Sequence, residues 1–260
     1  MILFAKRSGE SLNAGATQGE PWTEVGRMAT VADLQKVSEY ITQPNDQGVT
    51  GAVFLVGAGN LAMRGEMLQR YGVNPKMGDQ MGMVGTLWNA QVMAEDLTLA
   101  GIPNRLLKAA SVGYDMPDME KIHDVTPEQI CEAMRQKELV IIGGGSGKTG
   151  QTTDAAIIDH ALAMRAALGA DVRVLKGTKY EGVYDADPAR NPDARLLSAV
   201  SAYRMRDEGW AAVDARCLEL IGEHGMAMRV HAVEAPLLDA VAGTVGTLIV
   251  PQSGVLTYAA

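Results

Sequence analysis

The sequence predicts an α/β protein built on an open, mostly parallel sheet with helices on both faces. Short, wholly apolar runs at residues 52–56 and 139–142 have the composition of strands that are buried on both sides. Longer segments with apolar residues at helical spacing separate these runs, and this alternation favours parallel pairing. A chain of 260 residues is long enough to bury a substantial core in such a sheet.

The expected elements follow one another along the whole chain. Strands are expected at residues 2–5, 52–56, 105–109, 139–142, 172–175, 228–232 and 247–250. Helices are expected at residues 31–41, 81–99, 126–137, 152–168 and 212–224. Thr126 before Pro127 is a typical helix start, and Gly169 and Gly225 are typical helix ends. Residues 180–188 are expected to form a turn-rich loop, and residues 113–123 are the least regular stretch.

Composition and charge restrict the class of protein. The net charge is −8 and the pI is about 5.1, whereas a general nucleic-acid binder is usually basic. No apolar run reaches the roughly 18–20 residues that span a bilayer. Met1 leads directly into apolar residues and then into Lys6 and Arg7, the reverse of the order in a signal peptide. We therefore expect a cytoplasmic protein that binds a small molecule, without nucleic-acid or membrane partners.

Cysteine and histidine give no sign of a metal site held by the protein. The two cysteines, Cys131 and Cys217, fall in helix-like segments and are expected to be buried free thiols. The four histidines do not have the spacing of metal ligands and are more consistent with surface or core positions. They are His123, His160, His224 and His231.

Three glycine turns each follow a predicted strand, at Ser8-Gly9, at residues 57–59 and at residues 143–147. Such turns lie at the carboxyl edge of a parallel sheet, where backbone N–H groups and helix N-termini bind anions. The GGGSGKT run at 143–149 resembles a P-loop, but that pattern needs a glycine where this chain has Ile142. The turns therefore predict an anion site of a different kind.

Six short blocks occur in order along nearly the whole chain. They are KRSGESL at 6–12, GAGNLAMRG at 57–65, GDQMGM at 78–83, SGKTGQTTD at 146–154, TKYEGVYDADP at 178–188 and GTLI at 246–249. Together they resemble the bacterial uridylate (UMP) kinases, a branch of the amino-acid-kinase fold family. The resemblance implies a single domain over residues 1–260 with a carbamate-kinase-like, three-layer architecture. Its acceptor-binding half would be about 1–155 and its ATP-binding half about 156–260.

The resemblance implies that the chain moves the terminal phosphoryl group of ATP onto UMP, with Mg²⁺ as the partner of the ATP phosphates. Lys6 would neutralise the moving group with the N–H groups of Ser8 and Gly9, and Asp154 would orient that lysine. From the residues alone, Asp154 could instead be a first-turn aspartate that satisfies the helix dipole. The further ATP-binding positions would be Thr178, Lys179, Tyr184 and Asp187. Lys179 could equally be a cation on the loop surface.

On the acceptor side, the resemblance implies that Arg64 holds the acceptor phosphate as part of the catalytic set and that Asp79 accepts from the ribose hydroxyls. Thr153 would offer its hydroxyl or N–H group to the same phosphate. The other acceptor-binding positions are Gly57, Ala58, Gly59, Ser146 and Lys148. A hexamer is the expectation that comes with the family. The sequence itself shows only that the helix at 81–99 is apolar on more than one face, which suits an oligomer.

The chain departs from the family pattern mainly on the acceptor side. Arg64 comes one residue late, Ala58 replaces a glycine, and Glu181 replaces an aspartate. Residues 148–151, KTGQ, replace the asparagine-proline-aromatic stretch that lines the uracil pocket in the family. Three interpretations stay open: a divergent UMP kinase in which Lys148 contacts the base or the phosphate, a kinase of another anionic acceptor, or an ATP-binding oxyanion store similar to the molybdenum storage protein.

Overall fold

The computed structural model describes residues 1–14, 20–61, 71–109 and 122–259. Within them one ten-stranded sheet has the order β10-β7-β9-β8-β6-β1-β2-β5-β3-β4. Its strands are β1 (Ile2–Arg7), β2 (Gly51–Val56), β3 (Asn104–Lys108), β4 (His123–Asp124), β5 (Leu139–Gly143), β6 (Val172–Thr178), β7 (Leu197–Ser201), β8 (Met228–Ala232), β9 (Thr247–Val250) and β10 (Leu256–Tyr258). The pairs β8–β9 and β7–β10 are antiparallel and the others are parallel, which confirms the predicted fold class.

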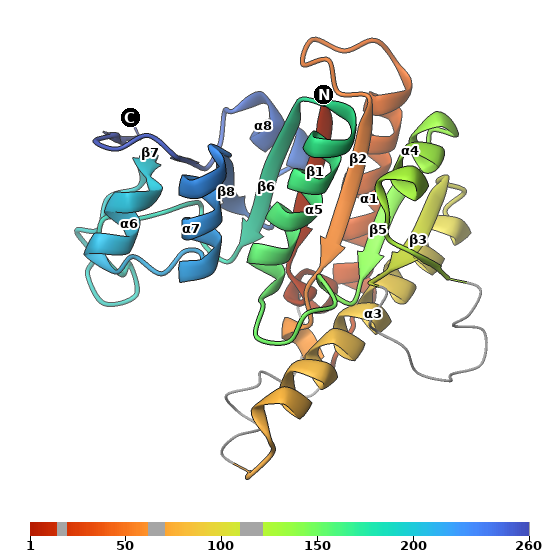
Figure 1. Cartoon of the computed structure of the whole chain (residues 1–260), viewed down its shortest axis with the longest axis horizontal. Coiled ribbons are helices and arrows are strands. Elements are labelled where there is room, and N and C mark those ends of the chain that lie inside the picture. Colours follow the sequence, from red (N-terminus) through yellow and green to blue (C-terminus); the bar gives the residue numbers. More distant parts are fainter. Residues whose placement is uncertain (15–19, 62–70, 110–121, 260) are drawn as a thin grey trace.

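Helices cover both faces of this sheet (Figure 1). One core is formed with α4 (Pro127–Arg135), α5 (Thr153–Leu168), α6 (Ala202–Glu208) and α7 (Ala215–His224). The core on the other face is formed with α1 (Glu24–Thr42), α3 (Pro75–Leu99) and α8 (Leu237–Ala242). Two short 3₁₀ helices, η1 (Gly9–Asn13) and η2 (Gly59–Leu61), directly follow the ends of β1 and β2. No helix among the described residues is long and apolar enough to cross a membrane.

Alternation along the central strands decides which side chains reach which face. Ile2 and Phe4 of β1 pack in the α5 core, whereas Leu3 and Ala5 pack in the α1–α3 core. Lys6 continues the first series at the carboxyl end of the strand. β6 follows the same rule, because Val174 faces α5 and Leu175 faces the other core. At the carboxyl end of β1, Lys6 is therefore on the face of the sheet that α5 covers.

Several predicted boundaries were wrong. β6 runs to Thr178, three residues beyond the prediction, and α3 begins at Pro75, six residues before it. α7 begins at Ala215 because Asp214 caps it, with Oδ1 accepting the Cys217 N–H at 3.0 Å. Cys131 is only partly buried, although Cys217 is fully buried as expected. Residues 113–121 of the irregular stretch lie outside the described residues.

Candidate functional site

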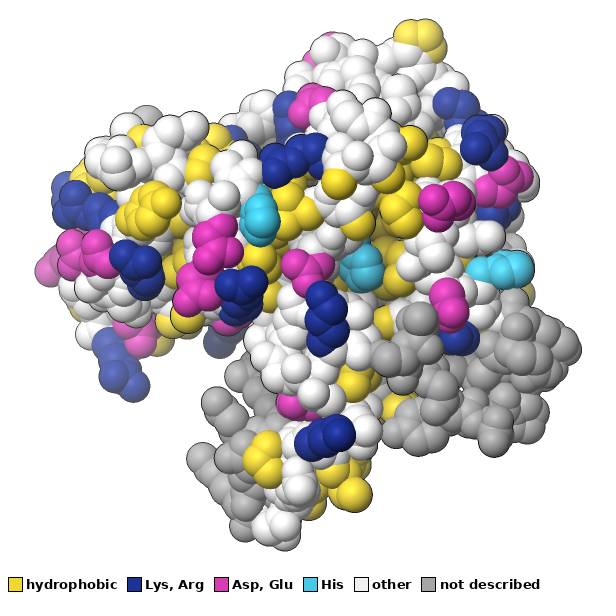
Figure 2. All heavy atoms as spheres, viewed as in Figure 1, with side chains coloured by type: hydrophobic (Ala, Val, Ile, Leu, Met, Phe, Trp, Pro, Cys, Tyr) yellow, Lys and Arg dark blue, Asp and Glu magenta, His cyan; other side chains and the backbone are white. Residues whose placement is uncertain are grey.

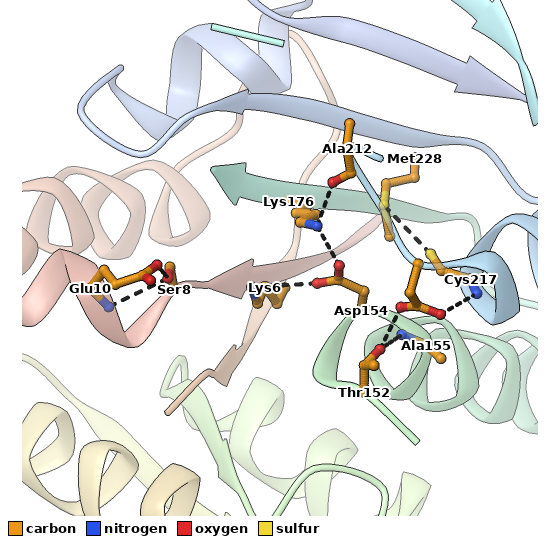
Figure 3. A network of polar contacts seen from close by, with 11 residues as sticks. Lys6, Ser8, Glu10, Thr152, Asp154, Ala155, Lys176, Ala212, Cys217 and Met228 are labelled. Carbon is orange, nitrogen blue, oxygen red and sulfur yellow. Dashed lines mark hydrogen bonds and ion pairs between the residues drawn. The ribbon is translucent and has the colours of Figure 1, made fainter. Parts of the chain in front are cut away.

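Two lysines on neighbouring strands meet one aspartate at the carboxyl edge of the sheet (Figure 3). Lys6 of β1 and Lys176 of β6 are register partners in a parallel pair. The Lys6 Nζ lies 3.4 Å from Asp154 Oδ1, and Lys176 Nζ donates to Asp154 Oδ2. A second bond, of 2.6 Å, runs from Lys176 Nζ to the carbonyl oxygen of Ala212. One carboxylate thus holds two ammonium groups side by side.

Asp154 stands in the first turn of α5, where an acidic residue is favoured by the helix dipole. Thr152 caps this helix, because its hydroxyl oxygen accepts the Ala155 N–H at 3.3 Å. Asp154 is only 9% exposed. Burial alone raises the pKa of its carboxyl group, but the attraction of Lys6 and Lys176 outweighs burial and holds the pKa below its ordinary value. The site therefore contains a carboxylate that stays ionised near neutral pH.

Lys176 was missed in the sequence, because the expected strand stopped at residue 175. The two-residue period of a strand could have indicated it, because residues 172, 174 and 176 lie on the same side of the strand and Val174 faces α5. Asp214 was missed as well. Its Oδ2 accepts the Thr152 hydroxyl proton, so α7 and α5 are tied together at their N-termini beside the lysines.

Two cavities meet at this cluster. The larger has a volume of about 860 Å³ and the other about 600 Å³. Lys6, Ser8, Glu10 and Asp154 line both of them. A ligand in one cavity would therefore lie next to a ligand in the other, with Lys6 and Asp154 at the junction.

The larger cavity collects many of the positions predicted for ATP. Lys6, Ser8, Thr178 and Lys179 line it, together with Lys176. Residues 233–236, after β8, and part of α1 complete the wall and were not predicted. Arg7 also lines it, and its guanidinium is paired with Asp33 of α1 at 2.5 Å.

Three predicted ATP positions, Gly9, Tyr184 and Asp187, are absent from the described lining of the larger cavity. Gly9 still belongs to the turn whose Ser8 lines it. The hydroxyl of Tyr184 donates to Glu181, and this bond raises the pKa of the tyrosine to about 12. Asp187 stabilises a turn, because its Oδ1 accepts the Ala189 N–H at 3.0 Å. Both residues thus have partners that are close to them in the chain, within the 180–188 loop for Tyr184 and just after it for Asp187.

The smaller cavity collects the positions predicted for the acceptor. Its lining includes Gly57, Ala58, Gly59, Asp79, Ser146, Lys148 and Thr153. Gly9, of the first glycine turn, packs against the second turn: a Cβ added there would lie 2.6 Å from the carbonyl oxygen of Gly57. Arg64, expected to hold the acceptor phosphate, falls in 62–70 and lies outside the described residues. The glycine turns and Asp79 are therefore brought together as expected, and the role of Arg64 stays a prediction.

Residues 148–151, which depart from the family pattern, contribute to the lining of this cavity and are held by several hydrogen bonds. The Gly150 N–H donates to Asp79 Oδ2 at 2.7 Å. The amide of Gln151 accepts from the Ser146 hydroxyl and donates to Asp159 Oδ2 at 2.7 Å. Lys148 is exposed, with its Nζ 3.5 Å from the same Asp159 carboxylate. The segment is thus an ordered polar wall.

Left-handed glycines allow the chain to make these turns. Gly144, Gly145, Gly147 and Gly150 all have φ between 62° and 86°, a region that other residues rarely adopt. The ring of His160 lies beneath the loop, with Nε2 3.0 Å from the carbonyl oxygen of Gly145. Burial lowers the pKa of His160, so its ring is neutral at pH 7. The described residues contain no group of three His, Cys, Asp or Glu side chains placed to hold a metal ion.

The fold and this site define a phosphotransferase: paired lysines and glycine turns face two adjoining cavities, an arrangement suited to two anionic ligands. The Amino acid kinase family model matches residues 1–231. A uridylate kinase of Mannheimia succiniciproducens is 32% identical over 255 residues, covering 95% of this chain and 96% of that protein. A uridylate kinase of Haemophilus influenzae is 33% identical over 249 residues, covering 93% and 94%.

Comparison with solved structures agrees on the fold. The crystal structure of UMP kinase from Bacillus anthracis superposes with a TM-score of 0.82, at 20% identity, and covers 98% of both chains. The chain belongs to the amino acid kinase family and, within it, to the uridylate kinases.

Proposed function

We propose that this protein transfers the terminal phosphoryl group of ATP to UMP, giving ADP and UDP. The observation that carries the proposal is the Lys6–Asp154–Lys176 cluster at the junction of two cavities. Uridylate kinase relatives that align over nearly the whole chain support the choice of acceptor. ATP is assigned to the larger cavity and UMP to the smaller one.

The acceptor oxygen belongs to a phosphate that is already an anion at neutral pH, so the reaction needs no general base. The task is to hold two anions in line and to neutralise charge on the transferring group. Lys6 and Lys176 supply that charge from adjacent strands. Asp154 reduces the repulsion between the two ammonium groups and fixes both, and is thus an orienting carboxylate. The Ser8 and Gly9 N–H groups lie at the end of the same strand, beside Lys6.

Magnesium fits the site as an ion that arrives with ATP. Hard oxygen ligands suit Mg²⁺, and nucleotide sites often supply few protein ligands besides the phosphates. The buried, ionised Asp154 is a carboxylate at the cavity junction that can take part in holding it. When bound, the ion would neutralise charge on the ATP phosphates.

On the acceptor side, Asp79 would accept from the ribose hydroxyls. The Gly150 N–H occupies one of its oxygens and so orients the carboxylate. Lys148 and Gln151 replace an apolar wall with donors, which suits the carbonyl oxygens of uracil. The same polar wall favours a second candidate, transfer to another anionic small molecule, and we test both together.

We further propose that α3 mediates association with other copies of the chain. The helix extends away from the sheet (Figure 1), and apolar side chains gather on its projecting end in the lower part of Figure 2. Met77 and Trp88 are 55% and 45% exposed. Exposed apolar side chains of this size on one helix are typical of an interface. Light scattering on the purified protein measures the assembly directly, and a monomer would contradict the proposal.

The first experiment measures ADP release with ATP and Mg²⁺ against a panel of acceptors: UMP, CMP, AMP, small carboxylic acids, phosphonates and none. The proposal predicts turnover with UMP well above the other acceptors. Turnover with another anion and none with UMP would replace UMP as the acceptor. The variant K6A is the control for the site, because loss of Lys6 should abolish turnover while leaving the fold intact. ATP-induced stabilisation without transfer to any acceptor would favour a storage role.

A further inference from the structure

A buried amide network lies directly behind two glycine turns at the cavity walls, Ser8-Gly9 and residues 57–59. Its centre is Asn89 of α3, which is 0% exposed. The carbonyl oxygen of its side chain accepts from Trp22 Nε1 at 2.8 Å and from Asn60 Nδ2 at 3.0 Å. Its Nδ2 donates to the backbone oxygen of Gly57 at 2.7 Å and to Asn60 Oδ1 at 2.6 Å. All four hydrogen-bonding positions of the amide are therefore used.

The network reaches the ATP-side turn as well as the acceptor-side turn. A Cβ added to Gly9 would lie 2.4 Å from Asn60 Oδ1 and 2.7 Å from Asn89 Nδ2, so Gly9 sits directly on the paired amides. The Gly57 N–H in turn donates to the backbone oxygen of Arg7 at 2.8 Å. The Asn60–Asn89 pair is thus the layer on which both turns rest.

The same helix also holds the third glycine turn. The hydroxyl oxygen of Thr86, one turn before Asn89, accepts the Gly144 N–H at 2.8 Å. Thr86 and Asn89 lie three residues apart and so share one side of α3. Side chains on this side of α3 hydrogen-bond to the backbone of two different glycine turns.

We propose that Asn89 is a positioning residue that sets the distance between the ATP-side turn, Ser8-Gly9, and the acceptor-side turn at 57–59. Asn89 lies behind the turns and acts through Gly57 and Asn60. In-line transfer depends on this spacing, since a misplacement of about 1 Å can cost about 10²-fold in rate. The inference rests on the proposed function, because it is measured through UMP-dependent turnover.

The test compares N89A with a matched control, N45A. Asn45 lies in the loop after α1, where its amide donates to the backbone oxygens of Tyr40 and Val49 and accepts the Val49 N–H at 2.8 Å. It is therefore also a well-bonded asparagine, but it lines neither of the two cavities at the site. Both variants should lower the melting temperature.

Only N89A should slow the chemistry: kcat falls about 10- to 100-fold, while the KM for ATP and the ATP-induced rise in melting temperature stay near wild type. N45A should keep the wild-type kcat. Rates are expressed per folded molecule. A wild-type kcat in N89A, or an equal loss in N45A, would overturn the inference.

Two further measurements keep the test decisive. If N89A does not fold, N89S replaces it, because a serine keeps one donor and fits the same space; kcat should again fall, and an unchanged kcat would overturn the inference. The wild-type protein is assayed first. Absence of UMP turnover in the wild type would count against the proposed function, whereas active wild type with unaffected N89A and N89S counts against the role of Asn89 alone.

Discussion

Lys176 places a second positive charge where one lysine would be sufficient to pair with Asp154. Because it is register-paired with Lys6, the two ammonium groups repel each other, and the ionised carboxylate of Asp154 between them offsets this repulsion. The arrangement keeps two cations, the buried Lys176 and the partly buried Lys6, close to the junction of the cavities. An anionic transition state can then be stabilised without a large reorganisation of the site.

We expect K176M to reduce kcat about 10²-fold or more, because it removes one of the two cations that we propose neutralise the transferring group. The loss of Lys176 also raises the pKa of Asp154. The matched control is K108M, since Lys108 is likewise a strand lysine paired with an aspartate, Asp124, at 2.6 Å, but in β3, next to the edge strand and away from the two cavities. The measurement is the steady-state kcat with UMP for K176M, K108M and wild type. Equal rates for K176M and wild type would remove Lys176 from the mechanism.

Lys148 gives a second prediction at this scale. If its ammonium group contacts the acceptor, K148A should raise the KM for UMP about 10-fold with little change in kcat. The partner variant K179A removes a lysine that lines only the ATP-side cavity of the two, and should raise the KM for ATP instead. Initial-rate measurements with each substrate varied in turn separate the two effects. An unchanged KM for UMP in K148A would show that this side chain points to solvent in the complex.

Among the elements, α3 and β5 pack so closely that one added methyl group between them should lower the stability of the protein. A Cβ at Gly143 would lie 2.7 Å from Leu87 Cα and 3.0 Å from Ala90 Cβ. G143A should therefore lower the free energy of unfolding by about 1–3 kcal/mol. G82A, in the same helix at a position where a Cβ meets nothing within 4 Å, should be neutral or slightly stabilising. Urea unfolding of both variants is the measurement, and equal stability would contradict the packing argument.

The sequence predicted the elements with strong periodicity and missed the weak ones. Strands β8 and β9 were predicted with their observed ends, and α5 ends at Leu168 with left-handed Gly169 as its cap. α6, α8, β7 and β10 were missed because they are only three to seven residues long, too short for a periodic pattern to stand out. The first turns of α3 were missed because they project into solvent and have no buried stripe. Asn74 before Pro75 was the available signal.

The sequence motifs identified many of the residues that the structure gathers around the two cavities, and the roles of these residues stay predictions. Lys6, Asp79, Asp154 and the glycine turns all line the two cavities or lie beside them. The sequence could not show that residues 148–151 would be anchored to Asp79 and Asp159, because those bonds join segments far apart in the chain. Nor could it reveal the Asn60–Asn89 pair, which depends on how α3 crosses the end of β2.

For the molecule as a whole, acid sensitivity should depend on His231. Burial lowers the pKa of this side chain to about 4, and Arg7 nearby adds to the effect, whereas an unfolded histidine titrates near 6.5. The fold favours the neutral ring, whereas the unfolded chain binds a proton at this histidine below about pH 6.5. The contribution of His231 to the free energy of unfolding is therefore complete above pH 6.5 and is lost as the pH falls towards 4. The contribution is of the order of 3 kcal/mol.

The variant H231N lacks this titration. Its free energy of unfolding should therefore fall less steeply than that of wild type between pH 6.5 and 4, as followed by urea unfolding at a series of pH values. Parallel curves for the two proteins would show that His231 is not the group responsible. Carboxylates that titrate in the same range affect both proteins alike and cancel in the comparison.

The pairing of β1 with β6 has a consequence for how the protein acquires activity. β1 can pair with β6 only after Val172–Thr178 has been synthesised, so Lys6 lies beside Lys176 only from that point on. Contacts between segments so far apart in the sequence form slowly during folding. During synthesis, an emerging chain can form β1–β2 while its catalytic centre is still incomplete. Enzyme turnover is thus a late event in maturation, and the recovery of activity after dilution from denaturant would report the closure of the central sheet.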